Sequence, residues 1–491
     1  MANWPSNVDG SSSPRRRLWK DNVWVGHNAP RLAPGRQPRG PVGGGPTGPV
    51  KVRRRVGWLF VACALVVAVA ACEGGGRGPR STATTAVAGG TAAATGGSFP
   101  ETYLADALDL IQGSAFYADR VDWPSVRAEA RRRAGAATTT AGTYDAIRWV
   151  LTKLGDHHSL LLSPEQARAL AAGGGRGFGL LALFPERVVI DVEPGGGADR
   201  AGIRAGDIVQ AVDGRPAQGD EIVTLPPATD GSGPARVALT LRRAHGGAEQ
   251  LRVTVEAAAL PAVRPPTARR LSARISMLEL FGVYTSAGPD AGRYVDAAHD
   301  AIREGATART CGWVVDLRRN TGGSLPPMLA AAGPILGEGT AVGYRGKDGA
   351  TSWFGYQDGT VTADGQPIRS LAARRPARLE RPRPPVAVLT SRLTGSSGEG
   401  VAMAFRGRPG ARSFGEPTAG VPTGNSPHRL TDGAELHLTE AVGVDRTGRS
   451  HQTRIKPDQP VATDWTRYGS PADPVLQAAI AWLDMRCSRS G

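Results

Sequence analysis

The sequence has little of what several common functions require. Only five of its 491 residues are lysine and four are cysteine, and the cysteines lack the paired spacing of a zinc module. No recognition helix or aromatic stacking motif accompanies the formal net charge of +15. Eleven basic and two acidic residues place +9 of that charge in the first 56 residues. Because the excess charge lies in one tail, the sequence predicts no nucleic-acid partner. We also expect no metal and no cofactor.

The N-terminal region has the pattern of an export signal. Four basic residues precede an apolar run from Val56 to Ala71, and small residues lead into Cys72. The end of this run resembles a bacterial lipobox, which implies lipidation of Cys72. The run is slightly short for a membrane-spanning helix. We therefore expect a protein body on the extracytoplasmic side of the cell membrane, held by a lipid or by one uncleaved N-terminal anchor. Whether Met1 is the true start stays open.

A chain of this length predicts two or three domains, and its patterns predict an α+β multidomain protein. The expected segments are a disordered basic tail (1–50), a signal or anchor (51–72), a flexible linker (73–98), a helical subdomain (99–172), a module of short strands (176–258) and a core of alternating strands and helices (268–487). Within these segments we expect helices at 101–112, after Asp122, at 143–154, 291–304, 325–336, 399–405 and 471–482, and strands at 275–281, 312–317, 386–389 and 436–442.

One turn in the core has the arrangement of a nucleophile site. The apolar run Val386–Leu389 reads as a buried strand, and a helical pattern begins at Glu399. Between them a glycine-bearing turn holds Ser396 and Ser397. A turn of this kind exposes the serine Oγ, and the free N–H groups of a helix start can hold an oxyanion. The alternative is that Ser396 only caps the helix.

Two other segments supply matching parts. The stretch 311–324, CGWVVDLRRNTGGS, reads as a strand followed by a glycine turn at Gly322, where backbone N–H groups can approach a ligand. The stretch 154–164, LGDHHSLLLSP, places His157 and His158 beside Asp156. Histidine is the usual general base for a serine nucleophile.

Together these segments resemble the tail-specific, or C-terminal processing, serine peptidases, and in particular the branch that includes the tricorn core protease. That family has motifs of the form L-G-D-x-H-S, D-L-R-x-N-x-G-G, G-S-x-x-E and G-E-P-T, and all four occur here in that order. The resemblance covers roughly Phe99 to the C-terminus. It implies a PDZ domain and an α/β protease core of the ClpP/crotonase type. It also implies Ser396 as nucleophile, with the N–H groups of Ser397 and Gly322 as oxyanion hole.

The same resemblance bears on the general base. Many members use a lysine downstream of the serine, but Val421 stands at that position here, with Asn425 at the partner position. The tricorn-like branch uses the histidine of the first motif, which maps to His158. Its acidic partner is not evident from the sequence. The carboxylates left open for that role are Glu416, Glu440, Asp445 and Asp458.

Residues 176–258 resemble a PDZ domain. Its carboxylate-binding loop maps to Gly177, Phe178, Gly179 and Leu180, whose backbone N–H groups would hold the carboxylate of a peptide C-terminus. Phe178 and Leu180 would border a pocket for an apolar terminal side chain. The alternative is a module that only packs against the core.

Two cysteines, Cys311 and Cys487, lie beyond the N-terminal region. An exported domain with two cysteines often pairs them, although two separate buried thiols are also possible.

The leading hypothesis is an exported or membrane-anchored serine endopeptidase that acts on protein substrates and recognises their C-termini. A catalytically weak PDZ-containing scaffold lipoprotein is the alternative, since the triad is incomplete, and a hydrolase of small esters is a third. The lipase pattern G-x-S-x-G is absent around Ser396 and Ser397, which weakens an α/β-hydrolase interpretation. Substrate identity and oligomeric state stay open.

Overall fold

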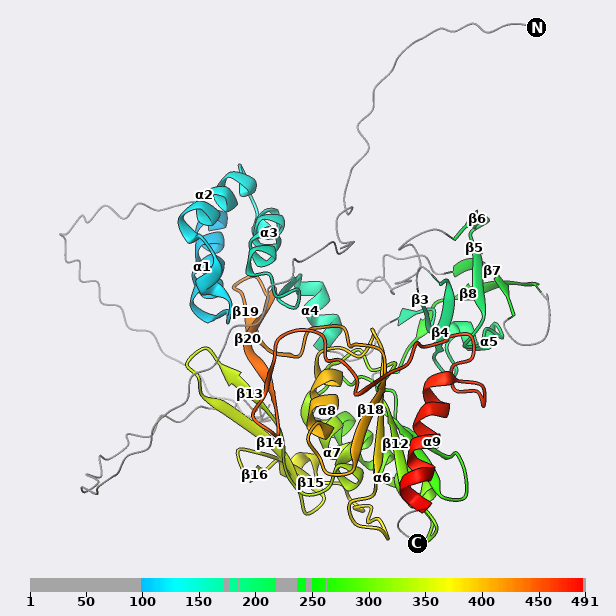
Figure 1. Cartoon of the computed structure of the whole chain (residues 1–491). Helices are drawn as coiled ribbons and strands as arrows, with labels where there is room; N and C mark the ends of the chain where they lie inside the picture. Colours follow the sequence, from blue (N-terminus) through cyan, green and yellow to red (C-terminus); the bar gives the residue numbers. More distant parts are fainter. Residues whose placement is uncertain are drawn as a thin grey trace, which may run out of the picture. The chain divides into compact units, whose positions relative to one another are not determined.

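The computed structural model describes residues 99–171, 176–183, 186–217, 236–243, 250–261 and 263–488. The predicted tail, the signal or anchor with Cys72, and the linker up to residue 98 lie outside the described residues. None of the helices within the described ranges is long and apolar enough to cross a membrane. The α+β fold class is confirmed, with a helical subdomain, a β-rich module and an α/β core (Figure 1).

The helical subdomain consists of α1 (Phe99–Ser114), α2 (Trp123–Ala134) and α3 (Tyr144–Leu154), close to the predicted bounds, followed by β1 (Leu160–Leu162) and α4 (Pro164–Ala171). The first three helices bury apolar stripes against one another, as their 3- and 4-residue spacing requires. Gly155 ends α3 in the left-handed conformation, with φ of 69°. The same core continues into a strand near the C-terminus, because β1 pairs antiparallel with β20 (Glu435–Asp445).

The β-rich module is a sheet with strand order β3-β4-β5-β7-β8. Its elements are β3 (Leu180–Leu183), β4 (Val188–Val192), the short helix α5 (Gly197–Arg200), β5 (Ile208–Val212), β6 (Arg215–Pro216), β7 (Arg236–Arg242) and β8 (Gln250–Glu256). Before and after it, β2 (Arg176–Gly177) pairs with β9 (Ala258–Ala259). This pair of short strands therefore joins the two chain segments that connect the module to the core.

The core is built on a six-stranded, mostly parallel sheet. In sheet order its strands are β10 (Thr267–Arg270), β11 (Ile275–Glu279), β12 (Gly312–Asp316), β17 (Val386–Thr390), β18 (Ala411–Gly415) and β22 (Gln459–Pro460), of which only β10 is antiparallel. Its helices are α6 (Gly288–Gly305), α7 (Leu325–Leu336), α8 (Ser397–Phe405) and α9 (Pro474–Ser488). In Figure 1, α9 lies on the other side of the strands from α7 and α8. Successive side chains of one strand enter opposite clusters: Val315 packs with α6, α7 and α8, whereas Val314 packs with α9. Both faces are thus covered, as a parallel sheet requires.

A second sheet was largely missed by the sequence analysis. It contains eight strands: β1 and β20, then β13 (Gly339–Gly346), β14 (Thr351–Gln357), β15 (Thr360–Ala363) and β16 (Gln366–Pro367), with β19 (Thr423–Arg429) and β21 (Ser450–His451) beside β20. Residues 339–367 are rich in glycine, threonine and charge, so their apolar positions are too sparse to show the period of a strand. The closing helix also begins three residues later than the predicted Pro471.

Two consecutive arginines after β12 fix the segment that leads to Gly322. Arg318 is fully buried between Asp316 (2.7 Å) and Asp473 (2.8 Å), so its charge is matched within the core. Arg319 pairs with Glu279 (2.6 Å) and with Asp191 of β4 (2.5 Å). The DLRRN motif is therefore tied to α9 on one side and to the β-rich module on the other.

Cys311 and Cys487 form a disulfide with a Cα–Cα distance of 5.8 Å, joining the start of β12 to the end of α9. The bridge closes a sequence separation of 176 residues. Since a disulfide of this span mainly restricts the unfolded chain, its loss is expected to lower the free energy of unfolding by about 2–4 kcal/mol. The measurement is denaturant unfolding of Cys311→Ser/Cys487→Ser against the wild type. Reductant should weaken only the wild type, and equal stability of both proteins would contradict this assignment.

Candidate active site

Ser396 lies in the strained turn between β17 and α8. Its backbone has φ of 50° and ψ of −119°, a conformation that costs a non-glycine residue about 1–3 kcal/mol. The backbone of Gly322 lies directly against it, since a Cβ built on Gly322 would be 2.7 Å from the Ser396 Cβ. Ser396 is also the N-cap residue of α8, so the capping and nucleophile interpretations describe the same position. The glycine turn at Gly322 and the serine turn at Ser396, which were predicted from separate segments, are therefore in contact.

Glu399 fixes the Ser396 turn through hydrogen bonds to its carboxylate. Its fully buried carboxylate accepts hydrogen bonds from the N–H groups of Ser396 (3.0 Å), Gly420 (3.0 Å) and Val421 (2.9 Å), and from the Thr418 hydroxyl (2.5 Å). Burial raises the pKa of Glu399, while the four hydrogen bonds act in the opposite direction. This one side chain thereby links the backbone of Ser396 to the GEPTAG segment.

His158 is positioned through its backbone and its ring. Its N–H donates to Asp156 Oδ1 (3.0 Å), and its carbonyl accepts from Asn425 Nδ2 (2.9 Å). Its ring Nδ1 lies 2.6 Å from Thr423 Oγ1. Burial lowers the pKa of His158, so the neutral imidazole is favoured, although the Asp156 charge opposes this effect. With Nδ1–H donating to Thr423, Nε2 carries the lone pair that a general base needs.

The segment 418–425 contacts both halves of the site. The N–H groups of Gly420 and Val421 donate to the carboxylate of Glu399. A few residues later, Thr423 and Asn425 contact His158. Asn425 is itself fixed, because its Oδ1 accepts from the Thr439 hydroxyl of β20 (3.0 Å). Val421, at the position where the resemblance would place a lysine, thus lies in a segment that here contacts the histidine.

None of the four carboxylates left open for the acid role hydrogen-bonds to the His158 ring in the described part of the chain. Glu440 pairs with His428 (2.6 Å), Asp445 with His451 (2.8 Å), and Asp458 accepts from Ser413 (2.8 Å). Glu416 keeps a buried Oε2 without a hydrogen-bond partner. The side chain that contacts the ring is instead the Thr423 hydroxyl, which sequence analysis missed because a threonine at this spacing carries no signature.

The two residues predicted to supply the oxyanion hole differ in their hydrogen bonds. Ser397 is the first residue of α8, where helix N–H groups lack an intrahelical partner, and its hydroxyl donates to the Gly323 carbonyl (2.6 Å). The Gly322 N–H donates to Asn320 Oδ1 (3.0 Å). Gly322 can therefore bind a substrate oxygen only if this bond to Asn320 opens, and its role stays a prediction.

In the β-rich module, Gly177 to Leu180 lead into β3, which is an edge strand within the described sheet. The carbonyls of Phe178 and Gly179 accept from Ala198 (2.8 Å) and Glu193 (2.9 Å). The Phe178 side chain is 2% exposed and packs in the core of the module, and Leu180 packs against the same core. Their role in bordering a pocket for a peptide side chain stays a prediction.

Comparisons with known proteins agree with this architecture. Residues 284–461 match peptidase family S41, and residues 188–243 match the PDZ domain. The nisin-resistance protein of Lactococcus lactis subsp. lactis is 34% identical over 148 residues, which cover 30% of this chain and 45% of that protein. The chloroplastic C-terminal processing peptidase of Tetradesmus obliquus is 27% identical over 351 residues, covering 65% of this chain and 69% of that protein.

Among solved structures, a lipoprotein from Streptococcus agalactiae has a TM-score of 0.51 at 20% identity, with 79% of this chain and 96% of that chain covered. At this identity the likeness shows a shared fold alone. Over residues 284–461 the core is therefore similar to peptidase family S41, whose members are serine-type hydrolases, and residues 188–243 match a PDZ domain.

Proposed function

We propose that this protein is an exported serine endopeptidase that cleaves protein substrates and recognises their C-termini through its PDZ domain. The observation that carries the proposal is the support that segment 418–425 gives to both Ser396 and His158. In this reaction Nε2 of His158 takes the Ser396 proton as Oγ attacks the scissile carbonyl. The same proton then passes to the amine leaving group as the scissile C–N bond breaks, and water hydrolyses the acyl enzyme to release the acid product and restore Ser396.

The oxyanion of the tetrahedral intermediate would be bound by the N–H of Ser397, aided by the helix start, and by the N–H of Gly322. In this step the Gly322 N–H gives up its hydrogen bond to Asn320 and donates to the substrate oxygen instead. Glu399 acts as a positioning residue, because it holds the Ser396 N–H and the 420–421 backbone rather than the substrate.

Two assays separate the proposal from its alternatives. A fluorophosphonate probe should label the wild type and not Ser396→Ala, whereas a scaffold lipoprotein would remain unlabelled in both forms. Cleavage of an unfolded protein should then depend on its last few residues. If the enzyme is labelled yet hydrolyses only small esters, the endopeptidase proposal fails.

The PDZ domain is expected to bind peptides that end in a free carboxylate and an apolar residue. The N–H groups of residues 177–180 would hold the carboxylate while the peptide extends edge strand β3. Amidation removes the charge and should weaken binding by about 1–3 kcal/mol, measured by calorimetry on the full chain. A bulky residue at Gly179 should have the same effect, since a Cβ there already approaches Glu193 and Gly196 at 3.2–3.3 Å. Equal binding of acid and amide peptides would make the module a packing element.

The extracytoplasmic location is also a proposal. It is supported by the apolar run that ends at Cys72 and by the Cys311–Cys487 disulfide, because such bonds persist in oxidising compartments. Mass spectrometry of the membrane fraction should find a lipidated N-terminal Cys72, and Cys72→Ser should abolish that species. An unmodified chain beginning at Met1 in the cytosol would overturn the proposal.

A further inference from the structure

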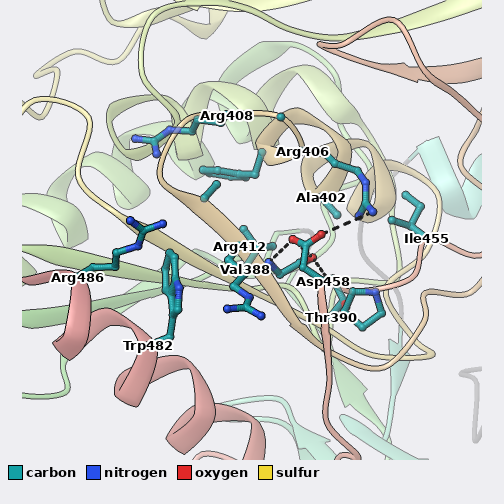
Figure 2. Close-up of a pocket in the computed structure, with 15 residues that line it drawn as sticks. Val388, Thr390, Ala402, Arg406, Arg408, Arg412, Ile455, Asp458, Trp482 and Arg486 are labelled. Atoms are coloured by element: carbon teal, nitrogen blue, oxygen red, sulfur yellow. Dashed lines mark hydrogen bonds and ion pairs between the residues drawn. The ribbon is translucent and has the colours of Figure 1, made fainter.

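A cavity of about 420 Å³ lies on the part of the core formed by β17, β18, α9 and the C-terminal half of α8 (Figure 2). Its walls include the apolar side chains of Phe405, Ile455 and Trp482. Neither Ser396 nor His158 lines it. The cavity is therefore separate from the proposed catalytic site, although both share α8.

The charged residues that line this cavity are four arginines and one carboxylate: Arg406, Arg408, Arg412, Arg486 and Asp458. We call it the arginine pocket. The single carboxylate is already engaged, since Asp458 accepts two hydrogen bonds from Ser413 and lies 3.7 Å from Arg406 (Figure 2). Arg408 and Arg412 lie at ion-pair distance from no carboxylate of the described residues, so the pocket keeps an excess of positive charge.

Arg408 makes that charge costly to leave unmatched. The side chain is buried, and it donates to the carbonyls of Ile335, Leu336, Pro384 and Pro409 at 2.8–3.1 Å. Within the described residues no carboxylate lies at ion-pair distance from it. Burial and the neighbouring arginines lower the pKa of Arg408 to about 10, so it remains charged at neutral pH. Its hydrogen bonds are satisfied, but its charge lacks a counter-ion.

Arg412 is the arginine with donors available to a ligand. It extends from β18, and its guanidinium lies 5.7 Å from the centre of the Phe414 ring. It forms no hydrogen bond or ion pair with another residue of the described ranges. An aromatic face of this kind orients the Arg412 guanidinium without occupying its N–H donors. Arg486 lies 5.5 Å from the centre of the Trp482 ring.

We propose that the arginine pocket binds a small organic acid with a flat apolar body. Its carboxylate, sulfonate or phosphate group would be held by the guanidinium of Arg412, and its body would lie against Phe405 and Trp482. Such an anion would supply the missing counter-charge for Arg408. The volume suits a compound of this size, and the apolar walls favour it over an inorganic ion.

The test uses 1-anilinonaphthalene-8-sulfonate as the anionic probe and uncharged N-phenyl-1-naphthylamine as its matched control, titrated by fluorescence on the full chain. The sulfonate should bind more tightly than the neutral compound. Arg412→Gln should weaken sulfonate binding about tenfold or more, as expected for loss of a charged hydrogen bond, and leave the neutral compound unaffected. Arg369→Gln, an exposed arginine outside the pocket, should change neither titration.

A second variant gives a change of opposite sign. Asp458→Asn removes the only acid of the pocket and should tighten sulfonate binding. Unchanged circular dichroism and thermal midpoints in all variants exclude misfolding as the cause. The proposal is overturned if the neutral compound binds as well as the sulfonate, or if Arg412→Gln leaves sulfonate binding unchanged.

Discussion

Ser396→Ala is expected to reduce kcat by about 10³-fold or more, because the alanine offers no nucleophile to the scissile carbonyl. The comparison is steady-state cleavage of a protein substrate by wild type and variant at equal concentration. Ser397→Ala is the matched control. It removes one hydrogen bond to the Gly323 carbonyl and keeps the N–H that the oxyanion hole uses, so its loss should be much smaller. If Ser397→Ala were inactive and Ser396→Ala active, the nucleophile would be the other serine.

The strained backbone of Ser396 adds a stability measurement to the same experiment. Glycine adopts a φ of 50° without the steric cost of a Cβ. Ser396→Gly should therefore be inactive, like Ser396→Ala. Its free energy of unfolding should exceed that of the wild type by roughly 1 kcal/mol, a figure that allows for the higher flexibility of glycine in the unfolded chain. A serine retained in this conformation at a cost in stability is what a functional constraint predicts.

His158→Ala is expected to produce the second large loss, again about 10³-fold or more in kcat. The more specific readout is pH. Because burial lowers the pKa of His158, the ring stays neutral below the ordinary histidine value of about 6.5. The acid limb of kcat/KM should therefore have its midpoint below that value, and activity should persist at mildly acidic pH. A limb centred above pH 7 would mean that another group is the base.

Thr423→Val tests how the base is held. Valine keeps the shape of threonine and removes the hydroxyl that contacts Nδ1. It should lower kcat less than His158→Ala does, and it should shift the acid limb, because the preferred tautomer of the ring loses its partner. A variant with unchanged rate and pH profile would show that Thr423 does not orient the ring.

The strands and helices of the core could be predicted because their residues are uniformly apolar or follow a helical period. Gly312–Asp316 and Val386–Thr390 are buried on both faces, and α7 has the predicted bounds. The hairpin strands at 339–367 could not, since they are polar on one face and rich in glycine. Their position is decided by pairing with β20, which lies about a hundred residues later in the chain.

The residues of the candidate site likewise divide into those that a local motif indicates and those that only distant contacts bring into place. Ser396, Gly322 and His158 each lie in a local motif with a chemical rationale, so the sequence could indicate them. The contact between His158 and Thr423 joins residues 265 positions apart and depends on how β1 and β19 meet β20. No local pattern encodes such a pairing. For the same reason the sequence could not show that three of the candidate acids, Glu440, Asp445 and Asp458, bind other side chains, or that Glu416 makes no hydrogen bond to the His158 ring.

The addition of β1 to β20 also has a consequence for biosynthesis. The histidine turn emerges from the ribosome early, but the strand and the hydroxyl that hold it belong to residues 423–445. A nascent chain therefore carries its serine and its histidine on separate, unconnected segments until nearly the whole polypeptide has been made. A chain assembled in this order has no complete site until residues 423–445 have been made, so it would not attack neighbouring unfolded chains, or itself, while it is still being synthesised.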